Sequence, residues 1–315
     1  MSKFVVTICT RGDYSAALDT MNAAFDCGID SEWFQKNMGN CTPYPHLANE
    51  VDIARHYIAK DDNGNVIGVV GAYPFEVVMK RKDGAGAVAV NAVGIGQVCT
   101  LKQWRGRNVM RSLLSTALDN AKANGAVMGF LSGDRFRYGR FGFDFGGENL
   151  TLNFQKHRYV NLVDQSGLWT KIAAPNDIPL LNELYTTLPA FVKRDDTAWK
   201  KQFQRLKHRW IIGEADGESG YIAYGDNKGE IVEAAGDTEV VKRLLSRHMI
   251  EHNLDSVSVS LPNDKTSAMY NALWALASHY TISQTDLAAV FAPIEDNTSV
   301  NLELYHFWVS NIDNI

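Results

Sequence analysis

The spacing of hydrophobic and polar residues along the chain predicts an alternation of strands and helices. Residues 4–8 form a short apolar run that is typical of a strand. Residues 13–25 place apolar side chains three and four positions apart behind a polar start, which predicts a helix. Two further apolar segments, 56–60 and 66–79, flank a polar turn that contains Asn and Gly, and this arrangement predicts a β-hairpin.

The chain then continues with a long extended segment and an amphipathic helix. Residues 87–101 predict a strand that contains Gly94 and Gly96, and glycine within a strand marks a bulge or the close approach of a ligand. From Val109 onward one apolar stripe follows helical spacing, and Asn124-Gly125 ends the helix. The first half is completed by a strand, a helical turn and a second strand, at residues 126–131, 134–138 and 149–154.

The second half repeats the order of the first. Residues 7–13 align with 171–177, and the strand-turn-strand at 58–68 resembles that at 211–220; a chance match of common strand-to-helix openings is the alternative. A helix, a strand and a helix follow at 238–252, 256–261 and 265–277. The sequence therefore predicts an α+β fold with mixed sheets, in two tandem domains at residues 1–158 and 159–315.

Composition places the chain among globular proteins. With 315 residues, 45% of them hydrophobic, it is long enough for two cored domains and too apolar for a disordered chain. The 31 basic against 36 acidic residues give a net charge of −5, which argues against binding nucleic acid or an anionic membrane. The four cysteines form no CxxC pair, and the apolar run at the start, residues 4–9, is too short for a signal peptide or a membrane span. We expect a cytoplasmic protein with reduced thiols.

No metal site is predicted. Residues 248–252 fit the HxxEH spelling of zinc peptidases, with both imidazoles one helical turn apart. Such a short spelling arises by chance, and no further acidic ligand accompanies it, so an ordinary surface helix is the preferred interpretation.

The chemistry is concentrated in residues 97–110, which run from a strand through a basic glycine loop into a helix. A helix N-terminus offers unpaired N–H groups and a partial positive charge, so it binds phosphate well. Gly106 lets the backbone approach a ligand, and Lys102, Arg105, Arg107 and Arg111 add positive charge that suits a pyrophosphate. The loop matches neither the P-loop nor the dinucleotide fingerprint.

At these residues the chain resembles the Gcn5-related N-acetyltransferase (GNAT) superfamily. Gln103, Gly106 and Asn108 occupy the places of that family's cofactor loop, although the last place is Gly or Ala in the family. Asparagine tolerates the left-handed conformation and caps helices well. The resemblance implies acetyl-CoA as co-substrate, bound by Val98, Cys99, Thr100, Gln103, Arg105, Gly106, Arg107, Asn108, Val109 and Met110. Backbone groups of the first three would contact the pantetheine arm and polarise the acetyl carbonyl.

A second motif follows in the family's order. Tyr138, with Gly142 and Phe143, matches the family's signature of Tyr, three residues and Gly-Phe. The resemblance implies that Tyr138 is the general acid that protonates the departing thiolate. Residues 133–138 look closest to the enhanced intracellular survival group of tandem acetyltransferases, although this chain is too short for their sterol-carrier-like domain. By analogy with that group, the terminal carboxylate of Ile315 would be the general base, with Glu76 or water as alternatives.

The resemblance implies an N-acetyltransferase that transfers acetyl to a primary amine by direct attack. Acidic residues between Asp26 and Asp52 favour a small cationic acceptor, or else form a solvated face. The second half is acidic where the first carries its basic loop, so we expect it to lack a cofactor site. A mycothiol-synthase-like acyltransferase and a non-catalytic acyl-CoA-binding or structural tandem protein remain as alternatives. The oligomeric state stays open between a monomer and a homo-oligomer.

Overall fold

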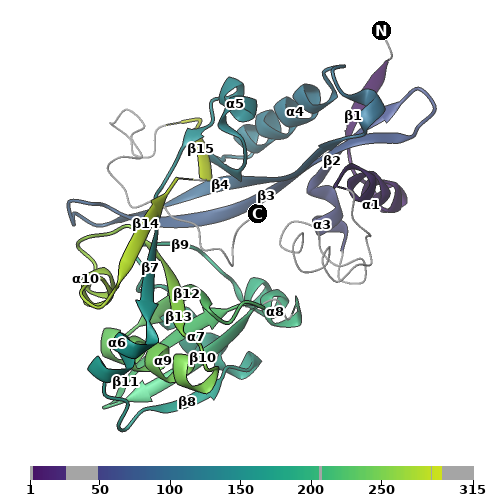
Figure 1. Cartoon of the computed structure of the whole chain (residues 1–315). Coiled ribbons are helices and arrows are strands. Elements are labelled where there is room, and N and C mark those ends of the chain that lie inside the picture. The colour runs from purple at the N-terminus through teal and green to yellow at the C-terminus, as the bar shows by residue number, and fades with distance from the viewer. Residues whose placement is uncertain (1–2, 26–48, 206–207, 285, 293–315) are drawn as a thin grey trace.

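The computed structural model describes residues 3–25, 49–205, 208–284 and 286–292. Two mixed sheets organise these residues, and helices cover the faces of both (Figure 1). The fold class predicted from the sequence, α+β with mixed sheets, is confirmed. None of the helices in the described ranges is long and apolar enough to cross a membrane.

The first sheet has eight strands, seven of them in one continuous order. In that order they are β1 (Phe4–Ile8), β2 (His56–Asp61), β3 (Val66–Lys80), β4 (Ala87–Thr100), β5 (Met128–Ser132), β15 (Asp286–Val290) and β6 (Asp144–Phe145). β4 and β5 pair in parallel, whereas the other neighbours pair antiparallel. The eighth strand, β9 (Ala190–Val192), pairs with the far end of β3.

The second sheet repeats this plan. Its strands in order are β8 (Trp169–Ile172), β10 (Arg209–Ala215), β11 (Glu218–Tyr224), β12 (Glu230–Gly236), β13 (Ser256–Pro262), β7 (Asn149–Gln155) and β14 (His279–Ser283). Here too the fourth and fifth strands are parallel and the other neighbours antiparallel. The shared order and sense of pairing are consistent with a tandem arrangement of two GNAT-like units.

Each sheet takes its sixth strand from the other half of the chain. β15 lies between β5 and β6 in the first sheet, and β7 lies between β13 and β14 in the second. The sequence predicted strand 149–154 as the closing strand of the first unit, which is wrong: the strand forms, but its hydrogen-bond partners are β13 and β14. The division of the chain at residue 158 stays a prediction.

The helices complete the layers. Their bounds are α1 (Arg11–Phe25), α3 (Glu50–Ala54), α4 (Val109–Ala123), α5 (Arg135–Tyr138), α6 (Lys156–Leu162), α7 (Ile178–Tyr185), α8 (Asp196–Arg205), α9 (Thr238–Glu251) and α10 (Ala268–Trp274), with short 3₁₀ turns at Lys102–Trp104, Gly139–Phe141 and Pro175–Asp177. The predicted helix at 265–277 is shorter than expected: it begins after Ser267, whose Oγ accepts a hydrogen bond from Tyr270 N, and it ends at Trp274.

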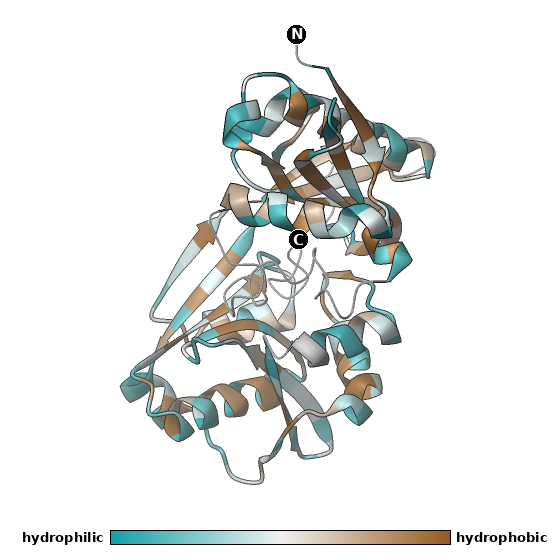
Figure 2. Ribbon diagram, turned by 90° about the vertical axis from the view of Figure 1, so that its right-hand side faces the viewer, coloured by the Kyte–Doolittle hydropathy of each residue, from teal (hydrophilic) through white to brown (hydrophobic). Residues whose placement is uncertain are grey.

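Hydrophobic residues recur along the strands of both sheets, where Figure 2 shows them in brown. On one face of the first sheet Leu113, Leu114 and Ala117 of α4 pack against Val93 and Ile95 of β4. On the opposite face α1 packs Ala17, Leu18 and Met21 against Ile58, Val69 and Cys99. The long strands β3 and β4 therefore have a covered layer on each side, and the cleft described next opens at the end of β4.

Candidate active site

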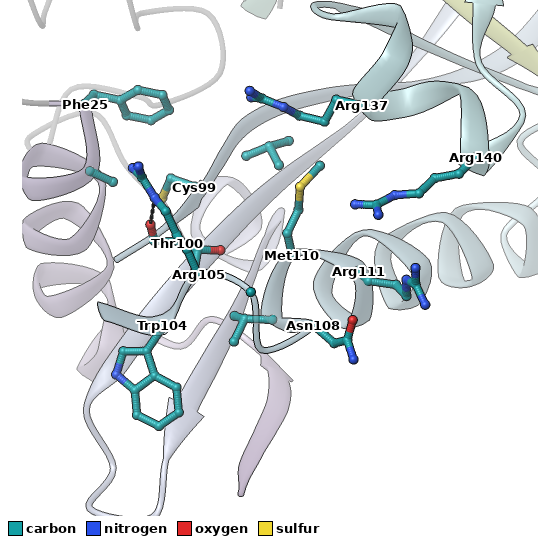
Figure 3. A pocket seen from close by; sticks show the side chains of 14 residues that line it. Phe25, Cys99, Thr100, Trp104, Arg105, Asn108, Met110, Arg111, Arg137 and Arg140 are labelled. Carbon is teal, nitrogen blue, oxygen red and sulfur yellow. Dashed lines mark hydrogen bonds between the residues drawn. The ribbon is translucent and has the colours of Figure 1, made fainter. Parts of the chain in front are cut away.

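A cleft of about 510 Å³ opens where β4 ends and α4 begins. Figure 3 shows side chains from α1, β4, the loop before α4, α4 itself and the α5 segment converging on it. The lining residues are Ala24, Phe25, Val98, Cys99, Thr100, Trp104, Arg105, Gly106, Asn108, Val109, Met110, Arg111, Arg137 and Arg140. The cleft thus brings together eight of the ten residues predicted to bind the cofactor.

The two remaining predicted residues lie on the outside of the loop. Gln103 is exposed within the 3₁₀ turn and does not line the cleft. Arg107 is also exposed, and its guanidinium lies 5.1 Å from the centre of the Trp104 ring. The loop therefore presents Trp104, Arg105, Gly106 and Asn108 to the cleft, whereas Gln103 and Arg107 lie outside it.

The end of β4 diverges from β5. Their parallel pairing runs from Ala92–Met128 to Gly94–Phe130 and goes no further along β4 in the described chain. Beyond Gly94 the strand contains a bulge, because the register with β3 shifts and Gln97 has a left-handed φ of 46°. The edge of β4 that faces the cleft is therefore available to an extended ligand.

A buried hydroxyl lies at the same place. Thr100 Oγ1 is buried without a hydrogen-bond partner among the described residues. Because such a group costs free energy when it is left unpaired, a polar ligand atom that reached it would supply the missing hydrogen bond.

The N-terminus of α4 is open toward the cleft. Asn108 occupies the N-cap position in the left-handed conformation, with φ of 63°, and its side chain makes no capping hydrogen bond. Gly106 has φ of 78°, a conformation that glycine adopts without strain. The first N–H groups of the helix lack intrahelical partners and carry the positive end of its dipole. An anion is therefore stabilised at this end of α4.

Arginines line two walls of the cleft. Arg105 Nε donates a hydrogen bond to the Thr100 carbonyl oxygen over 3.4 Å, and Arg111 extends from the first turns of α4. Arg137 and Arg140 reach in from α5 and the turn that follows it (Figure 3). The sequence reasoning missed this second pair, although both arginines flank the candidate acid Tyr138. Four guanidinium groups around one cleft favour a ligand with several negative charges.

Tyr138 lies immediately beside these arginines. It ends α5, its ring is buried, and it meets Phe143 edge to face at 6.3 Å between ring centroids. The ring packs so closely against Gly133 that a Cβ there would lie 2.7 Å from Tyr138 Cε2. Burial raises the pKa of the phenol above its ordinary value, and the nearby Arg137 guanidinium opposes that shift. The phenol is therefore protonated at neutral pH.

The two described cysteines are poorly placed to act as nucleophiles. Cys9 and Cys99 are both buried, and burial raises the pKa of each thiol to about 12. A thiol with such a pKa is almost entirely protonated at neutral pH, and the thiolate is the reactive form. An acyl-enzyme on either cysteine is therefore disfavoured.

None of the side chains or the terminal carboxylate predicted as a general base is found in the described part of the cleft. Ile315 lies outside the described residues, as do Asp26, Asp30 and Glu32 of the predicted acidic group. Glu76 accepts a hydrogen bond from Lys193 Nζ at 3.0 Å and does not line the cleft.

The part of the chain that forms this cleft matches a known family model. Residues 10–146 match the acetyltransferase (GNAT) domain. The GNAT match begins just before α1, ends just after β6, and includes every lining residue of the cleft. No curated protein sequence matches the chain.

Solved structures with the same fold extend the likeness beyond the GNAT match. A GCN5-related N-acetyltransferase from Kribbella flavida has a TM-score of 0.69 at 14% identity, with 92% of this chain and 72% of that one covered. A probable N-acyltransferase from Enterococcus faecalis V583 has a TM-score of 0.73 at 15% identity, with 92% of this chain and 73% of that one covered. Eis1 from Mycobacterium abscessus has a TM-score of 0.65 at 13% identity, with 91% of this chain and 74% of that one covered. At these identities the likeness shows the fold alone.

The corresponding helix of the second unit is closed to anions. α9 follows β12 as α4 follows β4, but the Asp237 side chain accepts hydrogen bonds from the N–H groups of Glu239 and Val240, both at 2.9 Å. A carboxylate therefore already occupies the place where a phosphate would bind.

The HxxEH motif at residues 248–252 lies at the C-terminal end of the same helix, α9. His248 is buried, and its Nε2 lies 2.7 Å from the Lys228 carbonyl oxygen. Across the described ranges, no group of three or more His, Cys, Asp and Glu side chains is arranged to hold a metal ion.

Proposed function

We propose that this protein is an N-acetyltransferase that uses acetyl-CoA and transfers its acetyl group to a primary amine by direct attack. The observation that carries the proposal is a cleft in which the open N-terminus of α4, four arginines and the diverging edge of β4 meet. The match of residues 10–146 to the acetyltransferase domain supports the same chemistry.

The cleft fits the parts of acyl-CoA one by one. The pyrophosphate would bind at the N-terminus of α4, where Arg105 and Arg111 add charge. The pantetheine arm, with its amides, would add to the edge of β4 beyond Gly94 in the manner of an extra strand. The unpaired Thr100 hydroxyl offers that arm a further hydrogen bond.

Tyr138 would act as the general acid. The amine nitrogen attacks the thioester carbonyl carbon, the carbon–sulfur bond breaks, and the leaving thiolate takes the phenol proton. The raised pKa of Tyr138 keeps that proton in place until the thiolate forms. Among the described residues, direct attack is favoured over a cysteine intermediate, because the thiols of Cys9 and Cys99 are buried and protonated.

Finer features belong to the same proposal. The two units would be a tandem GNAT pair of the enhanced intracellular survival type, in which the second unit shapes the acceptor pocket without binding acyl-CoA. The acceptor would be small and cationic, in keeping with the net charge of −5. Two members of the predicted acidic group are paired with basic side chains: Glu50 with Arg11 and Asp52 with Lys201. We expect the enzyme to work in the cytoplasm.

A thermal-melt titration with acetyl-CoA tests binding first. A ligand that binds only the folded state stabilises it by about 2.7 kcal/mol at a hundredfold excess over its Kd, so the melting temperature should rise with dose. Desulfo-CoA should give a similar rise and dephospho-CoA a smaller one, because one anionic group is missing. A screen of polyamines and amino sugars for CoA release would follow. No rise at millimolar acetyl-CoA, together with no CoA release, would overturn the proposal.

A further inference from the structure

A second cavity, of about 720 Å³, lies against the C-terminal half of α4, whereas the cleft lies at the N-terminus of that helix. The start of β2, the middle of β3 and β4, and α3 enclose the rest of it. In the described chain no residue lines both spaces. Arg111 of the cleft and Ala117 of the cavity are separated by roughly 9 Å along the helix axis, the rise of six residues. The cavity is therefore a site of its own.

Small and aromatic side chains shape this cavity. Tyr57, Pro74 and Phe75 line it with broad apolar surfaces. Six further lining residues are alanines, whose short side chains leave the space open: Ala54, Ala72, Ala92, Ala117, Ala121 and Ala126. Small-molecule sites in proteins typically have about 300–1,000 Å³ and mostly apolar walls with a few polar groups. The size and the walls of the cavity therefore fit a compact molecule with an aromatic ring.

The charge at the cavity is positive. Arg55 is the only charged residue that lines it in the described chain, and the Arg55 Nε atom is buried there without a hydrogen-bond partner. Arg55 Nη1 lies 3.2 Å from Asp52 Oδ1, and the same carboxylate accepts a hydrogen bond from Lys201 Nζ at 2.8 Å. One buried carboxylate is thus shared by two cations, which leaves the cluster with one net positive charge. A ligand with one negative charge would balance it.

The Tyr57 hydroxyl is a second donor at the cavity. Its oxygen accepts a hydrogen bond from Asn120 Nδ2, and Asn124 Nδ2 donates in turn to Asn120 Oδ1 at 2.8 Å. A phenol also donates, and among the described residues this hydroxyl has no acceptor for its proton. Arg55 and Tyr57 are two positions apart in the chain, and both line the cavity. The two oxygens of a carboxylate match these two donors.

We propose that this cavity binds an aromatic monocarboxylate, at a site that is additional to the cleft and independent of the proposed function. The carboxylate accepts hydrogen bonds from Arg55 Nε and from the Tyr57 hydroxyl. The ring lies among the alanines and contacts Phe75. It is the ring that points toward the end of α4, because the C-terminus of a helix carries the negative end of its dipole and repels an anion.

Saturation-transfer NMR titrations with phenylacetate and with uncharged phenylacetamide test the site. We expect phenylacetate to bind at least about tenfold more tightly, because a charge-assisted hydrogen bond is stronger than a neutral one. Arg55→Gln should remove that preference. Asp52 keeps Lys201 as its partner in this variant, so the buried carboxylate is not left unpaired. Arg158→Gln, an exposed change on α6 that also removes one positive charge, should bind both probes like the unchanged protein.

A second pair of variants tests the cavity through its volume. Ala121 lines the cavity, so Ala121→Leu should fill part of it and abolish the binding of both probes. Ala123 is exposed in the last turn of the same helix and does not line the cavity, so Ala123→Leu should leave both affinities unchanged. Leucine is a good helix former, and both variants should therefore melt at about the same temperature as the unchanged protein.

Acetyl-CoA distinguishes this site from the cleft. A saturating amount should leave the affinity for phenylacetate unchanged. If acetyl-CoA displaces phenylacetate, the probe lies in the cleft and the assignment is wrong. The assignment is also overturned if millimolar phenylacetate gives no signal, or if Arg55→Gln or Ala121→Leu binds it as tightly as the unchanged protein. If phenylacetate binds as expected while acetyl-CoA neither binds nor releases CoA, the proposed function fails and this site stands.

Discussion

Tyr138 has a ring that packs and a hydroxyl whose role can be tested separately. The ring contacts Phe143 and Gly133, and these contacts do not need the oxygen. Tyr138→Phe should therefore change the free energy of unfolding by only about 1 kcal/mol, the usual worth of one hydrogen bond. We expect kcat to fall by about 10²- to 10⁴-fold, because the thiolate then leaves without a positioned proton donor. Steady-state kinetics and a thermal melt measure the two effects.

The matched control is Tyr280→Phe, because Tyr280 is 54% exposed on β14 of the second sheet. It should alter neither kcat nor KM. An unchanged kcat in Tyr138→Phe would remove the acid assignment, whereas a large loss of stability would show that the hydroxyl has a structural role.

The arginines of the cleft can be divided by the wall to which they belong. Arg105 and Arg111 belong to the loop and α4, whereas Arg137 and Arg140 belong to α5 and its following turn. A hydrogen bond to a charged group contributes about 1.5–3 kcal/mol. Each of the single variants Arg105→Gln and Arg137→Gln, one from each wall, should therefore raise KM for acetyl-CoA at least about tenfold. Arg209→Gln, an exposed change on β10, is the control. Equal KM values in all variants would place the polyanion elsewhere.

The bulge in β4 depends on a buried network beneath it. Tyr73 Oη donates a 2.5 Å hydrogen bond to Gln97 Oε1 and lies 3.0 Å from His56 Nε2. Gly71 makes room for this contact, because a Cβ there would come within 2.3 Å of Tyr73 Oη. Burial lowers the pKa of His56 to about 4, so the imidazole is neutral at physiological pH. The divergence of β4 from β5 is thus held from the face opposite α4.

Gly71→Ala should displace this network. Overpacking of a filled interior typically costs about 1–3 kcal/mol, which predicts a fall of several degrees in melting temperature. KM for acetyl-CoA should rise as well, since the bulge at Gln97 shapes the edge of β4. Gly64→Ala is a useful comparison, because a Cβ added there would meet nothing within 4 Å. Any loss of stability in that variant comes from the φ of 81° alone. An unchanged KM in Gly71→Ala would separate the network from the cleft.

The sequence was sufficient for features that depend on neighbours along the chain. The hairpin of β2 and β3, helix α4 and its end at Asn124, and the turn that carries Tyr138 all have local signals, and all form. The partners of β7 and β15 were not predictable, because strand pairing between residues more than a hundred positions apart leaves no local pattern.

The exchange of strands makes each unit depend on the other. Residues 1–158 contain β7 without its partners β13 and β14, and lack β15, which separates β5 from β6. A fragment of residues 1–158 would therefore expose the edges of β5 and β7, and exposed edges promote aggregation. We expect it to show no cooperative thermal transition and no shift with acetyl-CoA. Co-expression with residues 159–315 should restore both, because the missing strands can then pair across fragments. A sharp transition and a ligand shift in the isolated fragment would instead show that residues up to 158 form an independent domain, and that β15 is dispensable for the cleft.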